Sequence, residues 1–102
     1  MRQYELVFIV QPLVDEEGLN AMIARVQQYI ERDGGQVGRI EPWGLRRLAY
    51  SIQDFWEGQY VLIRFSMGPL NVNTFDRGLR LTEGIIRHLI VQQDEAPAQL
   101  SE

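Results

Sequence analysis

The sequence of 102 residues contains no cysteine. Disulfide bonds, thiolate zinc sites and cysteine nucleophiles are therefore excluded, and nothing indicates an oxidising compartment. Histidine is almost as scarce, because His88 is the only one. A single histidine and scattered carboxylates lack the ligand spacing of a metal site. We therefore expect neither a metal nor any other cofactor.

Long apolar runs are also missing, since no stretch approaches the about 18 residues that a membrane span requires. The segment Met1–Leu6 leads directly into a strand-like pattern. A signal peptide would need a longer apolar run followed by a small-residue cleavage site. The sequence predicts a cytoplasmic protein without membrane segments.

Lysine is absent, so all ten basic residues are arginine, and the net charge is −4. Residues 11–35 hold five acids and two arginines, whereas residues 36–91 hold five acids and seven arginines. The planar fork of arginine suits bidentate phosphate contacts and stacking, although a GC-rich genome produces the same bias. A local basic patch in the second half therefore remains compatible with RNA binding.

Hydrophobic periodicity predicts four strands and two helices. The first helix has Asp15 as its N-cap and ends at Gly34–Gly35, and the second carries Val72, Phe75 and Leu79. Strands are expected at 2–10, 37–52 with an interruption at 42–44, 59–67 and 85–91, with a hairpin loop at 53–58. Residues 1–92 would form one domain and residues 93–102 a flexible acidic tail.

The order strand, helix, strand, strand, helix, strand predicts an α+β, ferredoxin-like split βαβ fold. Two right-handed crossovers place both helices on one face of a four-stranded antiparallel sheet. The other face is left uncovered and is unusually apolar. We expect it to carry Glu5, Val7, Ile9, Tyr60, Leu62 and Arg64.

The segment Trp43–Ile52 is the richest in binding chemistry. Arg46 and Arg47 are adjacent on a strand, so they point to opposite faces, and at least one projects to solvent if Leu45 and Leu48 are buried. Tyr50, Trp56 and Tyr60 add flat rings nearby. Arginines interleaved with aromatic rings are typical of RNA-binding sheets, but a hairpin with solvated arginines would give the same pattern.

Catalytic candidates are few. His88 lies within an apolar strand, and Glu16–Glu17 sits at a helix start, where acids stabilise the dipole. The glycines are separate turn signals and form no phosphate-binding fingerprint. The sequence therefore predicts a binding protein and not an enzyme.

The stretch Trp43-Gly-Leu-Arg-Arg-Leu-Ala-Tyr50 closely resembles the hallmark of the bacterial small-subunit ribosomal protein S6 family. The segments 1–6, 58–60 and 85–91 resemble the same family's first, third and fourth strands. The resemblance implies a structural protein of the small ribosomal subunit that forms a heterodimer with ribosomal protein S18 and binds small-subunit (16S-type) ribosomal RNA. By position it implies RNA or partner contacts for Arg2, Tyr4, Arg46, Arg47, Tyr50 and Arg87. To these the local pattern adds Trp56, Tyr60 and Arg64.

The sequence departs from the family at two places. Ser51 stands where many members have proline, and the hairpin has Asp54 and Glu57 where lysine is common, which favours contact through Phe55 or Trp56 over a phosphate contact. Two other hypotheses stay open: a ferredoxin-like module that dimerises and senses a small molecule, and a small dimeric α+β barrel enzyme that uses His88.

Overall fold

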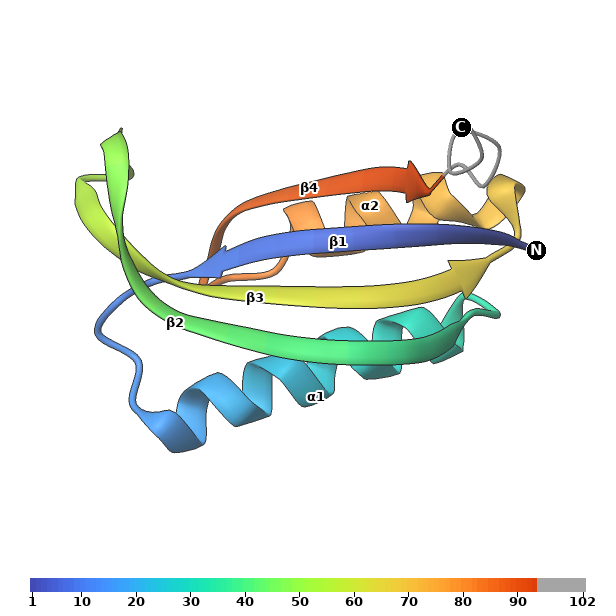
Figure 1. Cartoon of the computed structure of the whole chain (residues 1–102), viewed down its shortest axis with the longest axis horizontal. Helices are drawn as coiled ribbons and strands as arrows, with labels where there is room; N and C mark the ends of the chain where they lie inside the picture. Colours follow the sequence, from blue (N-terminus) through green and yellow to red (C-terminus); the bar gives the residue numbers. More distant parts are fainter. Residues whose placement is uncertain (94–102) are drawn as a thin grey trace, which may run out of the picture.

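Four antiparallel strands form one sheet in the order β2-β3-β1-β4, and two helices pack on one side of it, as the computed structural model shows for residues 1–93 (Figure 1). This arrangement confirms the ferredoxin-like βαββαβ fold. The elements are β1 (Arg2–Val10), α1 (Glu16–Arg32), β2 (Gln36–Ile52), β3 (Phe55–Met67), a short 3₁₀ turn (Pro69–Asn71), α2 (Val72–Arg80) and β4 (Ile85–Gln93).

The main core lies between the helices and the sheet. Alternation along β1 and β3 directs every second side chain to this layer, where the apolar stripe of α1 meets it. Asp15 caps α1 as expected, because its Oδ1 accepts from the Gly18 amide at 2.7 Å. The chain leaves α1 through Gly34, whose φ of +85° favours glycine. The largest fully buried side chains are Leu6, Phe8, Ile30, Ile63, Phe65, Met67, Phe75 and Leu79.

The hairpin between β2 and β3 corrects the expected loop at 53–58. The turn contains only Gln53 and Asp54, which have φ values of 52° and 69°, and Ile52 pairs with Phe55. Positive φ at both central residues is the geometry of a type I′ turn, which usually carries Asn-Gly. The sequence lacks that signal, so the third strand was predicted to begin at residue 59. The observed β3 begins four residues earlier, at Phe55.

The predicted interruption at residues 42–44 is a bulge within one continuous edge strand. Pro42 pairs with Val61 and Gly44 pairs with Tyr60, so Trp43 is the extra residue. A φ of +89° at Gly44 accommodates the distortion. The interruption that the proline and glycine indicated is therefore a bulge in an edge strand of the sheet.

β4 is longer than expected, because it continues to Gln93, which pairs with Gln3 of β1. The sequence pattern ended at Val91 since the last two residues are glutamines without apolar alternation. The remainder of the expected acidic tail, residues 94–102, lies outside the described residues. None of the helices within residues 1–93 is long and apolar enough to cross a bilayer.

Candidate nucleic-acid interface

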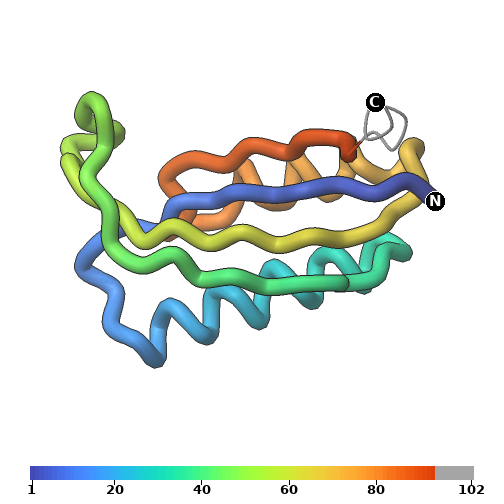
Figure 2. Tube along the Cα trace, viewed as in Figure 1, coloured from blue at the N-terminus to red at the C-terminus, as the bar shows by residue number. Residues whose placement is uncertain are grey.

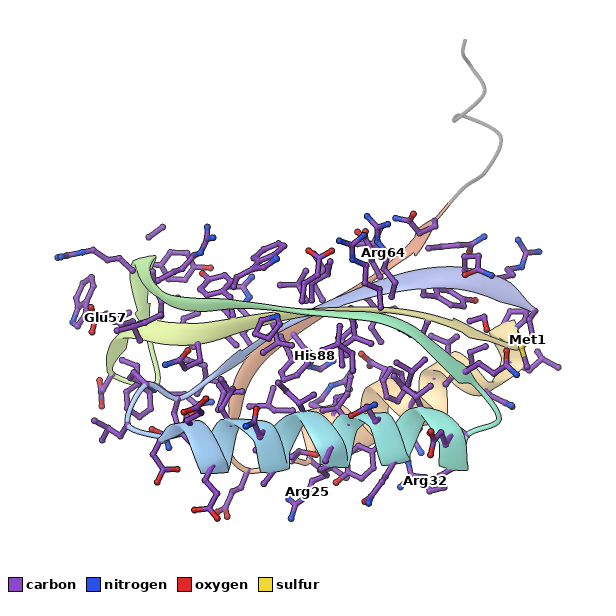
Figure 3. The ribbon with its side chains drawn as sticks, turned by 60° about the horizontal axis from the view of Figure 1, so that its bottom comes forward. Met1, Arg25, Arg32, Glu57, Arg64 and His88 are labelled. Carbon is purple, nitrogen blue, oxygen red and sulfur yellow. The ribbon has the colours of Figure 1, made fainter. Side chains whose placement is uncertain are left out.

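The face of the sheet opposite the helices is the first part of the candidate interface. The register places Val7 between Leu62 of β3 and Leu89 of β4, and Arg64 points away from the helices (Figure 3). The predicted residues of this face are therefore placed as expected. Leu89 and Val91 extend it with exposed fractions of 62% and 46%. Leu89 and Val91 were not predicted as site residues, although they share a strand face with the exposed Arg87, which was a usable signal.

The end of the β2–β3 hairpin folds back over this open face. Pairing between β1 and β3 ends at Val10 and Gln59, so residues 45–58 extend beyond β1 and form what we call the hairpin arm. Figure 2 shows the arm turning toward the β4 side of the sheet. Its Leu48 packs with Ile9 and Ile86 in a second, smaller buried cluster. Hydrophobic burial therefore holds the arm against the sheet.

Arginines and aromatic rings lie close together along the arm and at its base. The rings of Trp43 and Tyr60 stack with centroids 6.4 Å apart. The Arg46 guanidinium lies 5.4 Å from the centre of the Trp43 ring. Arg87 of β4 donates a hydrogen bond to the Tyr50 hydroxyl and lies 5.8 Å from the centre of its ring. Four predicted site residues therefore take part in two contact groups. Arg46 and Tyr60 each contact Trp43, and Arg87 contacts Tyr50.

A shallow cleft of about 190 Å³ lies between the arm and the sheet. Its walls include Ile9, Leu48, Tyr50 and Tyr60, and Arg87 adds a charged side chain. The surface therefore combines apolar walls and flat rings with a positive charge. This combination suits contact with nucleic acid or with a partner protein.

Arg47 and Trp56 complete the arm. Arg47 is exposed and stands opposite Glu57 in the β2–β3 ladder, while Trp56 is 57% exposed. Both arginines of the Arg-Arg pair project to solvent. Only one of the flanking leucines is buried, since Leu45 is exposed and Leu48 is not.

Three predicted site residues lie elsewhere. Tyr4 is a correction: it is 5% exposed and stacks on Phe65 in the main core, because it shares the helix-facing phase of β1. Arg2 lies opposite Met67 at the far end of the sheet, about 26 Å along β1 from the arm. Arg64 is on the open face, but its Nε donates to Glu5 Oε2 at 2.8 Å.

The one histidine faces the helices. His88 Nε2 donates to Asp76 Oδ1 at 2.7 Å, and 12% of its side chain is exposed. The enzyme hypothesis needed this residue as a catalytic group inside a closed cavity, and the structure places it in a contact with Asp76 between β4 and α2. Within residues 1–93, no group of three histidine, aspartate or glutamate side chains comes together to hold a metal ion.

Charge on the helix side is partly paired. Arg32 bonds to Asp33 at 3.1 Å, which raises the pKa of the Arg32 guanidinium. Arg80 bonds to Asp76 one turn away on α2. Arg46 and Arg47 therefore differ from these two in projecting from a strand arm that also carries exposed rings.

Comparisons of this chain with protein families and with individual known proteins agree on one family. Residues 3–92 match the family described as Ribosomal protein S6. The small ribosomal subunit protein bS6 of Clostridium perfringens strain SM101 is 41% identical over 95 residues, covering 93% of this chain and 100% of that protein. The protein of the same name from Clostridium beijerinckii is 43% identical over 93 residues, covering 91% and 98%.

A solved structure agrees with the sequence matches. The crystal structure of 30S ribosomal protein S6 from Thermotoga maritima superposes with a TM-score of 0.88 at 33% identity. The superposition covers 96% of this chain and 92% of that one.

Proposed function

This chain belongs to the ribosomal protein S6 family of the small ribosomal subunit, and from that premise we propose that it binds 16S-type ribosomal RNA together with ribosomal protein S18 as a heterodimer. Its role is structural, as expected of a ribosomal protein family, and its place of action is the cytoplasmic ribosome. The observation that supports RNA contact most strongly is the hairpin arm, where Arg46 and Arg47 project beside exposed aromatic rings.

The acidic total supports the need for a partner. At a net charge of −4, long-range attraction between this chain and phosphate is poor. Tight binding to RNA depends on a set of basic contacts that release counterions. A basic partner on the apolar open face would supply the missing charge and would cover Leu89 and Val91.

The proposal divides the surface between two ligands. The open face offers apolar side chains on β1 and β4, the kind of surface that a protein partner buries. The hairpin arm offers arginines and rings, the kind of surface that contacts phosphates and unstacked bases. Arg87 and Tyr50 lie where the two surfaces meet.

Replacing Arg46 and Arg47 together with alanine tests the RNA contact. An exposed arginine substitution changes stability by no more than about 0.5 kcal/mol, so the melting curve should stay nearly unchanged. Loss of charge-assisted phosphate contacts costs about 1.5–3 kcal/mol each. We expect binding to the complex of S18 and in vitro transcribed small-subunit rRNA to weaken at least about tenfold, with a shallower salt dependence.

The matched control replaces Arg25 and Arg77 with alanine. Both are exposed residues of the helices, so the net charge changes by the same amount. Figure 3 shows Arg25 pointing away from the sheet. The control should bind like the unmodified chain. Equal weakening in both double variants would show that the loss of affinity comes from the change in net charge and not from a specific contact. Unchanged binding in the Arg46 and Arg47 variant would contradict the proposed contact.

A further inference from the structure

Gly58 lies where the hairpin arm presses on the sheet. A Cβ atom at Gly58 would lie 2.2 Å from Ile9 Cγ2 and 3.3 Å from the Val10 carbonyl oxygen. Ile9 is itself buried in the second cluster, so its branched side chain has little room to move away. Only glycine therefore allows the arm to approach β1 as closely as it does.

The close approach joins the two edges of the sheet. β2 and β4 are separated by β3 and β1, a span of about 14 Å across three strand spacings. Tyr50 of β2 nevertheless accepts a hydrogen bond from Arg87 of β4. The fold-back of the arm over the open face brings these two residues together.

The contact also fixes the direction of the Arg87 guanidinium. One of its five N–H donors is used on Tyr50, which leaves the others for a further acceptor. A free arginine side chain samples many rotamers, and ordering it on binding weakens affinity. Holding Arg87 in place beforehand reduces that cost.

We propose that Gly58 and Tyr50 are positioning residues of the nucleic-acid interface: Gly58 keeps the arm folded down, and Tyr50 then orients Arg87 toward RNA phosphate. This inference rests on the proposed function. It assigns no RNA contact to Gly58, whose effect passes through the arm.

The first experiment compares Gly58→Ala with Gly68→Ala. Gly68 lies at the opposite end of β3 with a φ of −67°, and an added Cβ there meets no atom within 4 Å. Both variants are expected to fold by circular dichroism. In Gly58→Ala, nuclear Overhauser contacts between the Tyr50 ring and Arg87 should disappear. Its affinity for small-subunit rRNA with S18 should fall about threefold to tenfold, the range that one hydrogen bond controls, while Gly68→Ala binds normally.

A second substitution tests the cause. Ile9→Ala removes the methyl group that the new Cβ would meet. Because Ile9 also packs in the cluster that holds the arm, Ile9→Ala alone is the reference. If the clash is the cause, adding Gly58→Ala to Ile9→Ala should lower affinity less than adding it to the unmodified chain. An equal loss in both backgrounds, or a Gly58→Ala variant that binds like the unmodified chain, would overturn the inference.

Tyr50→Phe keeps the test decisive if Gly58→Ala does not fold. This change removes the hydroxyl acceptor and leaves the ring and the arm in place. It should weaken binding by a similar factor, and it should have no further effect when Arg87 is already alanine. An equal effect in both backgrounds would show that Tyr50 acts without Arg87 and would overturn the positioning role. If the unmodified chain fails to bind the rRNA with S18, the proposed function fails instead.

Discussion

At the residue scale, the candidate interface joins side chains from the two edge strands of the sheet: Arg46, Arg47 and Tyr50 come from β2, and Arg87 comes from β4. Arg46, Arg47 and Tyr50 were predicted from the arginine–aromatic segment and its family resemblance, and Arg87 was predicted from the resemblance. The first three are exposed on the hairpin arm, and Arg87 of β4 contacts Tyr50. Tyr4 was chosen from the resemblance alone. The alternation of β1 already placed it with Leu6 and Phe8, and that simpler signal was correct.

Tyr4 should therefore affect stability and not RNA contact. Tyr4→Phe keeps the ring that stacks on Phe65, so we expect unchanged affinity for the S18–rRNA complex. Tyr4→Ala leaves a cavity and should lower the free energy of unfolding by about 3–5 kcal/mol. Urea unfolding and filter binding measure the two effects. A Tyr4→Phe variant that folds normally but binds more weakly would restore Tyr4 to the interface.

At the element scale, the fold class and the order of elements follow from periodicity, whereas boundaries depend on local geometry that the sequence states weakly. The helices were found because capping residues and apolar stripes agree. The hairpin was misjudged because Gln53 and Asp54 are uncommon in a turn with two positive φ values. The fold-back of the arm packs Leu48 against Ile9, a residue 39 positions away, and no local pattern contains that contact.

The turn itself offers a stability prediction. Replacing Gln53-Asp54 with Asn-Gly supplies the residues that prefer positive φ at both central positions. We expect the free energy of unfolding to rise by about 1 kcal/mol, because backbone strain is relieved while the β2–β3 register stays the same. Denaturant midpoints at unchanged slope measure the gain. As the control, Ser51→Gly should destabilise the hairpin, since glycine weakens strands; a gain there would mean that the arm responds to flexibility and not to turn geometry.

At the scale of the whole molecule, charge distribution and exposed apolar surface both favour function within an assembly. The chain is acidic overall, its arginine-bearing arm is local, and Leu89 and Val91 remain exposed on a face without helices. A protein partner and RNA would together cover these features. The chain alone should accordingly bind rRNA weakly at physiological salt.

Removing residues 94–102 tests whether folding depends on these residues, because the truncation changes the net charge but leaves every helix and strand intact. Every element of the sheet and both cores lie within residues 1–93. The shortened chain loses Asp94, Glu95 and Glu102, so its net charge changes from −4 to −1. We expect its melting temperature to shift by less than about 4 °C, which corresponds to under 1 kcal/mol in a domain of this size. Calorimetry decides, and a larger fall would show that these residues contribute to the folded state.

The central claim is that the hairpin arm and the open sheet face form the surface that RNA and the partner cover. Hydroxyl-radical footprinting with mass spectrometry, on the free chain and on the chain assembled with S18 and small-subunit rRNA, tests it most directly. In the free chain Trp43, Tyr50, Trp56 and Leu89 are all exposed and should react. Assembly should protect these four side chains and leave Leu13 and Leu81 beside the helices as reactive as before. Protection of Leu13 and Leu81, with Trp43, Tyr50, Trp56 and Leu89 still reactive, would place the interface on the helix side and contradict the claim.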